Sequence, residues 1–320
     1  MIGRRDLLIG GGTVFATAVI TKIGTEISDD VVGIVRDTAA RFGDNDEYEI
    51  EAIKSVFGPI DVRSSFIPGQ SHPHPRYRGD FHPDDEFVAD VFDELVRDVV
   101  EDRVKYNTDE IPQTLEGISL ISGSPVSNAT SRYLFEFDYV DPSDKMAGLT
   151  RSSSPIFETD FEFLLEKDAL SKLGISDRIG TRGITGNWSI VNKKTGDIFA
   201  STIQNGRLTS DYLLVTRLPN VFDKQSYEKN EALYVLAGAH GVGTKAVDLL
   251  LRDEPLLRKL DQRVGGTMYW QALFQIDGVD HYHHTEKFGV RWHPTSISRD
   301  FEFATVSFDE ARLEKMARWS

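Results

Sequence analysis

Hydrophobic residues recur at helical spacing most clearly in the stretch that follows Asp84. Spacings of one, three and four separate seven apolar positions, which are Val88, Val91, Phe92, Leu95, Val96, Val99 and Val100. This period places them on one face of a helix, and the acidic Asp84 and Asp85 stand where negative charge favours the N-terminal end of the helix dipole. The pattern predicts an amphipathic helix from about residue 84 that packs against a core.

Short apolar runs bounded by turn residues predict β-strands elsewhere in the chain. These runs are residues 117–122, 187–192, 211–220 and 267–279. The run at 187–192 is followed by Lys-Lys-Thr-Gly and then by a second run at 197–203, an order typical of a β-hairpin. Residues 48–57, "YEIEAIKSVF", fit a strand or a helix, because so short an apolar run does not settle the period.

Capping patterns predict two further helices. Thr159 and Glu162 form a capping box at the start of "DFEFLLEKDALSKLG", and Gly174 follows as the terminating residue. Ser307 and Glu310 repeat the same pattern near the end of the chain. We therefore expect one helix from about residue 160 to 173 and another that begins after residue 307.

Strands that alternate with helices indicate an α/β protein. We predict a three-layer, Rossmann-like fold whose sheet is mixed, because the β-hairpin adds antiparallel strands, and whose N-terminal segment is helical. The expected divisions are a signal or membrane-anchor segment at residues 1–27, a helical preamble with a Pro/His-rich loop at 28–110, and an α/β domain at 111–320. A single domain that includes the preamble is the alternative.

The N-terminal segment resembles a twin-arginine export signal, because Arg4 and Arg5 precede an apolar, glycine-containing run and acidic residues follow. The small-x-small triplet at 16–18 lies inside that run, so an uncleaved anchor is an alternative to a cleaved signal. The segment predicts export, or a membrane tether through residues 4–23 with the body outside the cytoplasm. A cytoplasmic protein with a buried N-terminal element is the alternative.

Composition narrows the classes of partner. The 320 residues carry a formal net charge of -15, which argues against nucleic acid, because phosphate backbones are bound by clustered Lys and Arg. The chain has no cysteine, which excludes disulfides, thiolate metal sites and a cysteine nucleophile.

The segment 234–251, "YVLAGAHGVGTKAVDLLL", runs from an apolar strand through a glycine-rich loop into an amphipathic helix. Gly238 and Gly243 have the spacing of a P-loop, but that motif needs Lys before Ser or Thr, and here Thr244 precedes Lys245. One position on a helix turns a side chain by about 100°, so the ammonium group would point away from the phosphates. A P-loop ATPase is therefore not predicted.

The same loop resembles the G-x-G-x-x-A form of the dinucleotide-binding fingerprint at Gly241, Gly243 and Ala246. It lies late in the chain. The fingerprint also requires an acidic residue at the end of a strand about 20 positions further on, and none is found there. Tight packing of a helix against a sheet would require the same glycines and is an equally weighted alternative.

A second strand-to-helix loop, "ISGSPVSNATSR" at 121–132, suggests that two loops face one cleft that holds a small anionic ligand, a nucleotide or a phosphorylated metabolite. The candidate ligand-binding residues are Gly123, Ser124, Ser127, Asn128, Arg132, Gly238, Gly241, Gly243, Thr244 and Lys245. His240 is the catalytic candidate. Simple N-capping of a helix is the alternative role for Ser127 and Asn128.

Histidines form two clusters in the sequence. The first comprises His72, His74 and His82 near Asp84 and Asp85, and the second comprises His281, His283, His284 and His293 near Glu286. His-x-His on an extended segment places both rings on one face, which suits a metal of the zinc class. Neither cluster completes a hydrolase signature, so we assign no metal ligand and no cofactor.

Three classes of function follow. The first is a domain that binds or senses a small anion, and the second is a nucleotide-directed or metal-assisted hydrolase or transferase that uses His240. The third is a non-catalytic envelope protein in which these loops are structural. The sequence assigns neither a substrate nor an oligomeric state.

Overall fold

The computed structural model describes residues 46–60, 64–69, 83–96, 110–140, 149–165, 188–204, 207–283 and 290–319. Contacts divide the chain into two units, Met1–Tyr48 and Glu49–Ser320, and the second unit holds nearly all described elements. Several predictions lie outside the described residues, namely those for the export segment, His72, His74, His82, His284, Glu286 and the helix end at Gly174. None of the described helices is long and apolar enough to cross a bilayer.

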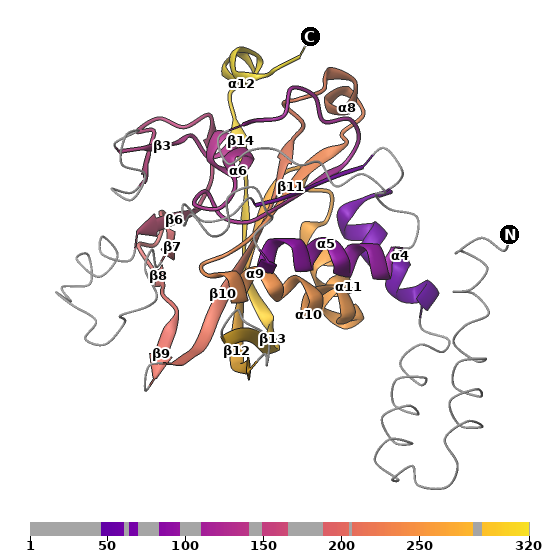
Figure 1. Ribbon diagram of the computed structural model, residues 1–320. Coiled ribbons are helices and arrows are strands. Elements are labelled where there is room, and N and C mark those ends of the chain that lie inside the picture. The colour runs from indigo at the N-terminus through magenta and orange to yellow at the C-terminus, as the bar shows by residue number, and fades with distance from the viewer. Residues whose placement is uncertain are drawn as a thin grey trace, which may run out of the picture. The chain divides into compact units, whose positions relative to one another are not determined.

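A mixed sheet lies at the centre of the second unit (Figure 1). Its strand order is β1 (Ser65–Pro68), β2 (Ser119–Ser122), β11 (Ala232–Gly238), β10 (Arg207–Pro219), β12 (Trp270–His283) and β13 (Val290–Thr305), with β9 (Thr202–Gln204) paired to β10. The pairs β1–β2 and β2–β11 are parallel, and the remaining pairs are antiparallel. The prediction of an α/β fold with a mixed sheet is confirmed.

One face of the sheet is covered by helices (Figure 1). They are α4 (Asp46–Phe57), α5 (Pro83–Leu95), α9 (Gly241–Lys245), α10 (Val247–Arg252) and α11 (Glu254–Val264). Val88 and Phe92 of α5 are fully buried in the core between these helices and the sheet, as the hydrophobic period predicts. The ambiguous segment 48–57 is helical, because Ile53 and Phe57, four residues apart, share that core.

The other face of the sheet carries α6 (Ala129–Leu134), short strands and the C-terminal segment, which share a second core. The short strands are β3 (Phe137–Tyr139), β4 (Leu149–Arg151), β5 (Phe157–Glu158), β6 (Phe161–Leu165), β7 (Trp188–Asn192), β8 (Ile198–Phe199) and β14 (Ser307–Phe308). The remaining helices are α8 (Lys224–Glu228) and α12 (Glu310–Met316). Burial on both faces explains why β11 is apolar at every position, since alternate side chains enter opposite cores.

The predicted hairpin is confirmed, because β7 pairs antiparallel with β8 across residues 193–197. The helix predicted after Thr159 is wrong over its described part, where residues 161–165 form β6. Phe161 and Phe163 are buried, whereas Glu162 between them is half-buried, which is the two-residue period of a strand. The three successive apolar residues Phe163, Leu164 and Leu165 obscure that alternation in the sequence.

The predicted C-terminal helix is confirmed, but its capping residue differs. The side chain of Asp309 accepts from the backbone N–H of Arg312, so the N-cap is Asp309, and Ser307 belongs to β14. Asp and Ser are both good N-caps. Ser307 is held in a strand by the pairing of β14 with β5, so the helix begins after Asp309.

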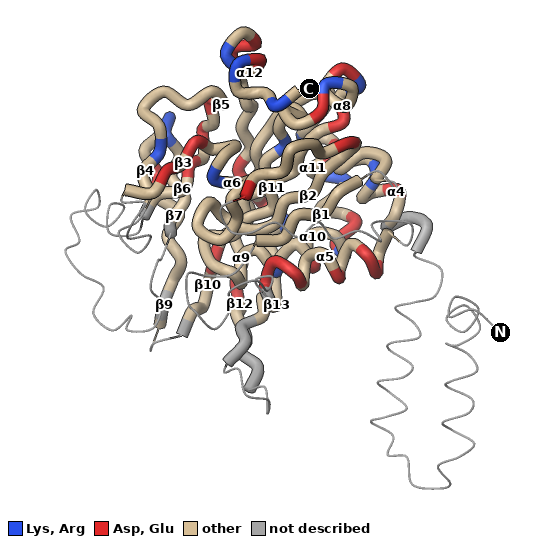
Figure 2. The backbone as a smooth tube through the Cα atoms, turned by 45° about the horizontal axis from the view of Figure 1, so that its top comes forward, with Lys and Arg blue, Asp and Glu red and all other residues tan. Residues whose placement is uncertain are grey.

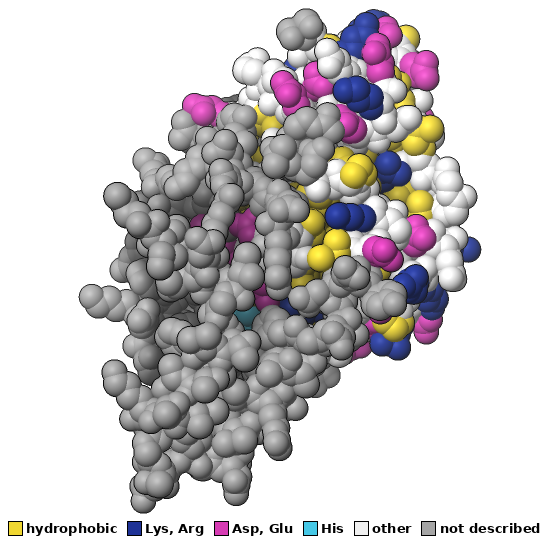
Figure 3. Space-filling model, turned by 90° about the vertical axis from the view of Figure 1, so that its right-hand side faces the viewer, with side chains coloured by type: hydrophobic (Ala, Val, Ile, Leu, Met, Phe, Trp, Pro, Cys, Tyr) yellow, Lys and Arg dark blue, Asp and Glu magenta, His cyan; other side chains and the backbone are white. Residues whose placement is uncertain are grey.

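Charged residues are distributed unevenly along the described chain. Acidic residues are prominent on α5 (Figure 2), whose first turn contains Asp84, Asp85 and Glu86. On the face shown in Figure 3, cationic and anionic side chains are interspersed over the described part, and neither sign forms a continuous patch. The described part of this face shows no basic surface of the kind that follows a phosphate backbone.

Candidate functional site

Three parallel strands end at one edge of the sheet. Strands β1, β2 and β11 are neighbours in register, with Ser122 opposite both Pro68 and Leu236. The N–H of Gly123 donates to the carbonyl of Leu236 (3.0 Å), so the loop after β2 starts beside the end of β11. The first turn of α5 reaches the same edge, where the Ser122 hydroxyl donates to the carbonyl of Asp85 (2.9 Å). The two loops singled out in the sequence therefore leave from adjacent strands.

Asn128, in the loop after β2, has a structural role. Its Oδ1 accepts from the N–H groups of Thr130 (2.9 Å) and Ser131 (3.3 Å), which caps α6. Its Nδ2 donates to the carbonyls of Ile67 (2.9 Å) and Ser122 (2.8 Å). These four bonds tie α6 to the ends of β1 and β2, so the N-cap alternative describes Asn128.

Arg132 also turns inward. Its guanidinium donates through Nη1 to the carbonyls of Pro125 (3.0 Å) and Val126 (3.2 Å) and lies 5.0 Å from the centre of the Tyr139 ring. The side chain thereby holds the loop after β2 in shape. Ser124 and Ser127 of this loop are half-buried, which leaves their side chains in partial contact with solvent.

The loop after β11 is held by its own residues. The N–H of Gly238 donates to the Thr244 hydroxyl (2.9 Å), so Thr244 closes the turn. A Cβ atom at Gly243 would lie 2.8 Å from Asp211 Oδ2, and one at Gly241 would overlap the carboxylate of Asp84. The glycines thus permit two carboxylates to approach the backbone closely.

Lys245 lies in an ion pair at the same edge. Its Nζ is 2.6 Å from Asp84 Oδ1, and its side chain is 4% exposed against 24% for Asp84. The pair joins the first turn of α5 to α9. The ammonium group of Lys245 is therefore already paired with a carboxylate of the protein.

Asp211 lies in β10 and was not among the candidates identified from the sequence. Its Oδ2 accepts from the backbone N–H groups of Gly243 (2.7 Å) and His240 (3.2 Å), and its Oδ1 accepts from the Ser201 hydroxyl (2.7 Å). The side chain is fully buried. The backbone donors expected to receive a ligand anion are therefore filled by a carboxylate of the chain itself.

Ser201, His240 and Asp211 have the composition of a hydrolase triad but not its geometry. In a triad, the serine and the carboxylate contact opposite nitrogens of the histidine ring. Here both contact Nδ1, at 2.9 Å for Ser201 Oγ and 3.2 Å for Asp211 Oδ1, and Ser201 is buried. The set fits a histidine oriented by a carboxylate, with its ring 14% exposed at the edge of the sheet.

The remaining histidines give no metal centre within the described ranges. His281 and His283 lie in β12, and His293 lies in β13, where its ring meets the ring of Phe87 edge-on at 5.4 Å. Among the described residues, no group of three or more His, Asp or Glu side chains is placed to hold a metal ion.

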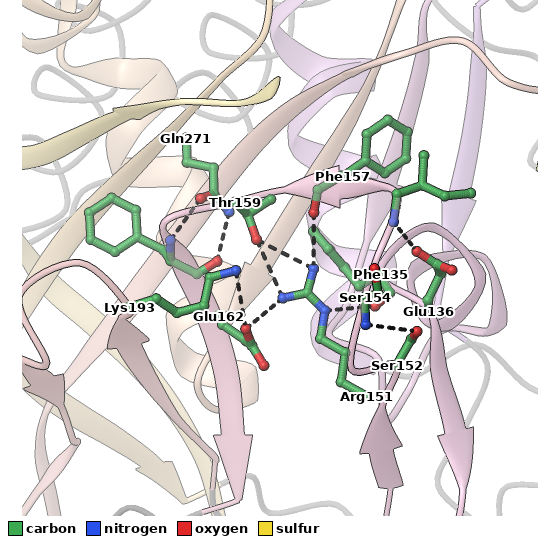
Figure 4. A network of polar contacts seen from close by, with 12 residues as sticks. Phe135, Glu136, Arg151, Ser152, Ser154, Phe157, Thr159, Glu162, Lys193 and Gln271 are labelled. Atoms are coloured by element: carbon green, nitrogen blue, oxygen red, sulfur yellow. Dashed lines mark hydrogen bonds and ion pairs between the residues drawn. The ribbon is translucent and has the colours of Figure 1, made fainter. Parts of the chain in front are cut away.

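A second polar cluster lies in the layer of short strands (Figure 4). Arg151 of β4 pairs with Glu162 of β6 (2.7 Å), and its guanidinium also donates to the carbonyls of Phe135 (2.9 Å) and Phe157 (3.4 Å). Nearby, the Gln271 side chain exchanges two bonds with the backbone of Phe161 (2.9 and 3.0 Å). These contacts join four separate segments to the main sheet, so we regard this cluster as structural.

Comparison with known proteins adds no assignment. No family model, curated protein or solved structure matches this chain.

Proposed function

We propose that the protein binds a small polar ligand, a nucleotide or a phosphorylated metabolite, in a Rossmann-like crevice at the carboxyl edge of β1, β2 and β11. The meeting of the loops after β2 and β11 with the first turn of α5 carries this proposal, because ligands of open α/β sheets collect where strand-to-helix loops meet. Partly exposed polar residues from these loops and from α5 border the edge, namely Ser124, Ser127, His240 and Asp84.

The filled backbone donors refine the expected ligand. Because Asp211 accepts from the N–H groups of His240 and Gly243, a phosphate is not expected at that position. Carboxylate and imidazole acceptors suit hydrogen-bond donors, such as the hydroxyl groups of a sugar or the amino group of a base. We therefore expect the sugar or base of a nucleotide, more than its phosphate, to dominate recognition.

A thermal-shift screen tests this proposal. The probes are nucleosides, the matching nucleotides, sugar phosphates and orthophosphate, and a ligand at 100 times its Kd should stabilise the fold by about 2.7 kcal/mol. Ser124→Ala and His240→Gln should reduce the shift, whereas Ser153→Ala, an exposed serine on the β4–β5 loop, should not. No shift with any probe, or equal shifts in all three variants, would count against the proposed site.

A second candidate function is turnover of that ligand with His240 as general acid–base. The contact of His240 Nδ1 with the buried Asp211 favours it, because catalytic histidines are commonly oriented by a carboxylate in this way. The test is to follow the stabilising ligand by phosphorus NMR and chromatography. His240→Gln should abolish breakdown, and retention of full activity would exclude this role. Stabilisation without breakdown in the wild type would leave the binding function alone.

A non-catalytic role outside the cytoplasm is the third candidate, and it rests on the twin-arginine-like segment. Fractionation of the wild type and of the Arg4→Lys/Arg5→Lys variant tests it. We expect the wild type outside the cytoplasm and the double variant retained inside. Cytoplasmic recovery of both proteins would contradict export, and membrane recovery of the wild type would favour a tether through residues 4–23.

A further inference from the structure

Three polar atoms form a closed triangle beside the proposed crevice. Ser201 Oγ lies 2.7 Å from Asp211 Oδ1 and 2.9 Å from His240 Nδ1, and the third side, from Nδ1 to Oδ1, is 3.2 Å. All three separations are within hydrogen-bond range for N and O atoms. The triangle therefore constrains where its protons lie.

The number of protons decides between the two neutral forms of the histidine. An ionised carboxylate only accepts, and a serine hydroxyl has a single proton to donate. If Nδ1 carried a lone pair, the serine proton could satisfy only one of the other two atoms of the triangle, and Nδ1 would face Oδ1 with two lone pairs opposed. If Nδ1 carries the proton, Ser201 donates to Asp211 and Nδ1–H donates to Ser201 and Asp211. Only this second arrangement makes every side of the triangle attractive.

We infer that neutral His240 is held as the Nδ1–H tautomer, with Nε2 as its proton-accepting nitrogen, and that Asp211 is the residue that positions it. The two backbone N–H groups on Oδ2 support this assignment, because they fix the carboxylate in the orientation that presents Oδ1 to the ring. Asp211 thus sets both the shape of the loop after β11 and the chemical character of the ring.

This inference deepens the proposed function, on which it rests for its relevance, since the tautomer decides which ring nitrogen is able to accept a proton. The tautomer itself does not depend on a ligand. Its test therefore uses the ligand-free protein, so that a failure of ligand binding and a failure of the tautomer assignment are separate results.

The measurement is a long-range proton–nitrogen NMR spectrum of the full chain labelled with 15N-histidine at about pH 8.5, above the usual histidine titration near about 6.5. Eight histidines contribute, and His240→Gln identifies the ring of interest by the signals it removes. We expect a pyrrole-type signal for Nδ1 and a pyridine-type signal for Nε2. The reverse pattern in the wild type would overturn the inference.

Two variants test the positioning role. Asp211→Asn should shift the ring toward the Nε2–H form, because the amide offers its NH2 group where the carboxylate accepted. Ser201→Ala should retain the Nδ1–H form, because Oδ1 remains 3.2 Å from Nδ1. Asp138→Asn, on the exposed side of β3, should leave the spectrum unchanged. An unaltered tautomer in folded Asp211→Asn would overturn the role of Asp211, and the wild-type spectrum decides the tautomer even if that variant does not fold.

Discussion

Removal of the buried Asp211 carboxylate should be among the most destabilising single changes at this edge of the sheet. In Asp211→Ala, the N–H groups of Gly243 and His240 lose their acceptor, and the buried Ser201 hydroxyl loses its own. A buried donor left without a partner costs about 1–3 kcal/mol. Two such backbone donors, with partial reorientation of the serine, give an expected loss of about 3–5 kcal/mol. That is a large share of the roughly 5–15 kcal/mol by which domains are stable. Asp211→Asn keeps one acceptor oxygen and should lose about 1–2 kcal/mol.

The assay is guanidinium unfolding at neutral pH, followed by tryptophan fluorescence and circular dichroism, with the midpoint and slope fitted together. Asp138→Ala serves as the matched control, because Asp138 is exposed and its removal should change the free energy of unfolding by less than about 0.5 kcal/mol. A free energy of unfolding for Asp211→Ala within about 1 kcal/mol of that of the control would contradict this prediction. Such a result would mean that the donors find other acceptors and that the carboxylate does not organise the loop.

Four other changes test neighbouring parts of the structure. Gly243→Ala should lower the free energy of unfolding by about 1–3 kcal/mol, since a Cβ there meets a backbone carbonyl, and an unchanged melting temperature would contradict the close approach. A double-mutant cycle of Asp84→Asn and Lys245→Met should give a coupling of about 1 kcal/mol or more, whereas additive losses would mean that the pair is energetically unimportant. Arg151→Met should cost about 2–3 kcal/mol in chemical denaturation, because its partner carboxylate is only 23% exposed. Burial raises the pKa of Tyr234 to about 12, so the stability it contributes is present below pH 10 and falls by about 2–3 kcal/mol as the pH rises from 10 to 12. Unfolding at several alkaline pH values should show a weaker decline in Tyr234→Phe.

Most of the described fold can be predicted from the hydrophobic pattern, because its helices and strands bury one face or both. The apolar positions Val88, Val91, Phe92 and Leu95 identify α5, and the long apolar run at 211–220 identifies the central strand β10. The pattern fails at 161–165, where "FEFLL" satisfies a helical and a strand period equally. Only the pairing of β6 with β7, which is a contact between distant segments, decides that case.

Only part of the candidate site could be predicted from the sequence, for a similar reason. Glycine spacing located the loop after β11, since close backbone approach leaves a mark in the sequence. It did not identify Asp211, which lies 29 positions before His240 and begins the apolar run 211–220 within β10. Its place beside an apolar run is the one signal in the sequence. An acidic residue there either faces solvent or is buried with its hydrogen bonds satisfied. The sequence alone does not distinguish these two states.

The internal carboxylate changes what the glycine loop implies about a ligand. A turn with several N–H groups pointing one way binds negative charge, and the letters of the loop do not say whose charge it is. In this protein Asp211 supplies it, Lys245 is paired with Asp84, and Arg132 is directed into its own loop. Three of the groups best suited to hold a phosphate are therefore committed within the chain. Serine hydroxyls and an oriented imidazole also lie at this edge, and they support the proposed ligand rich in hydrogen-bond donors more than an isolated anion.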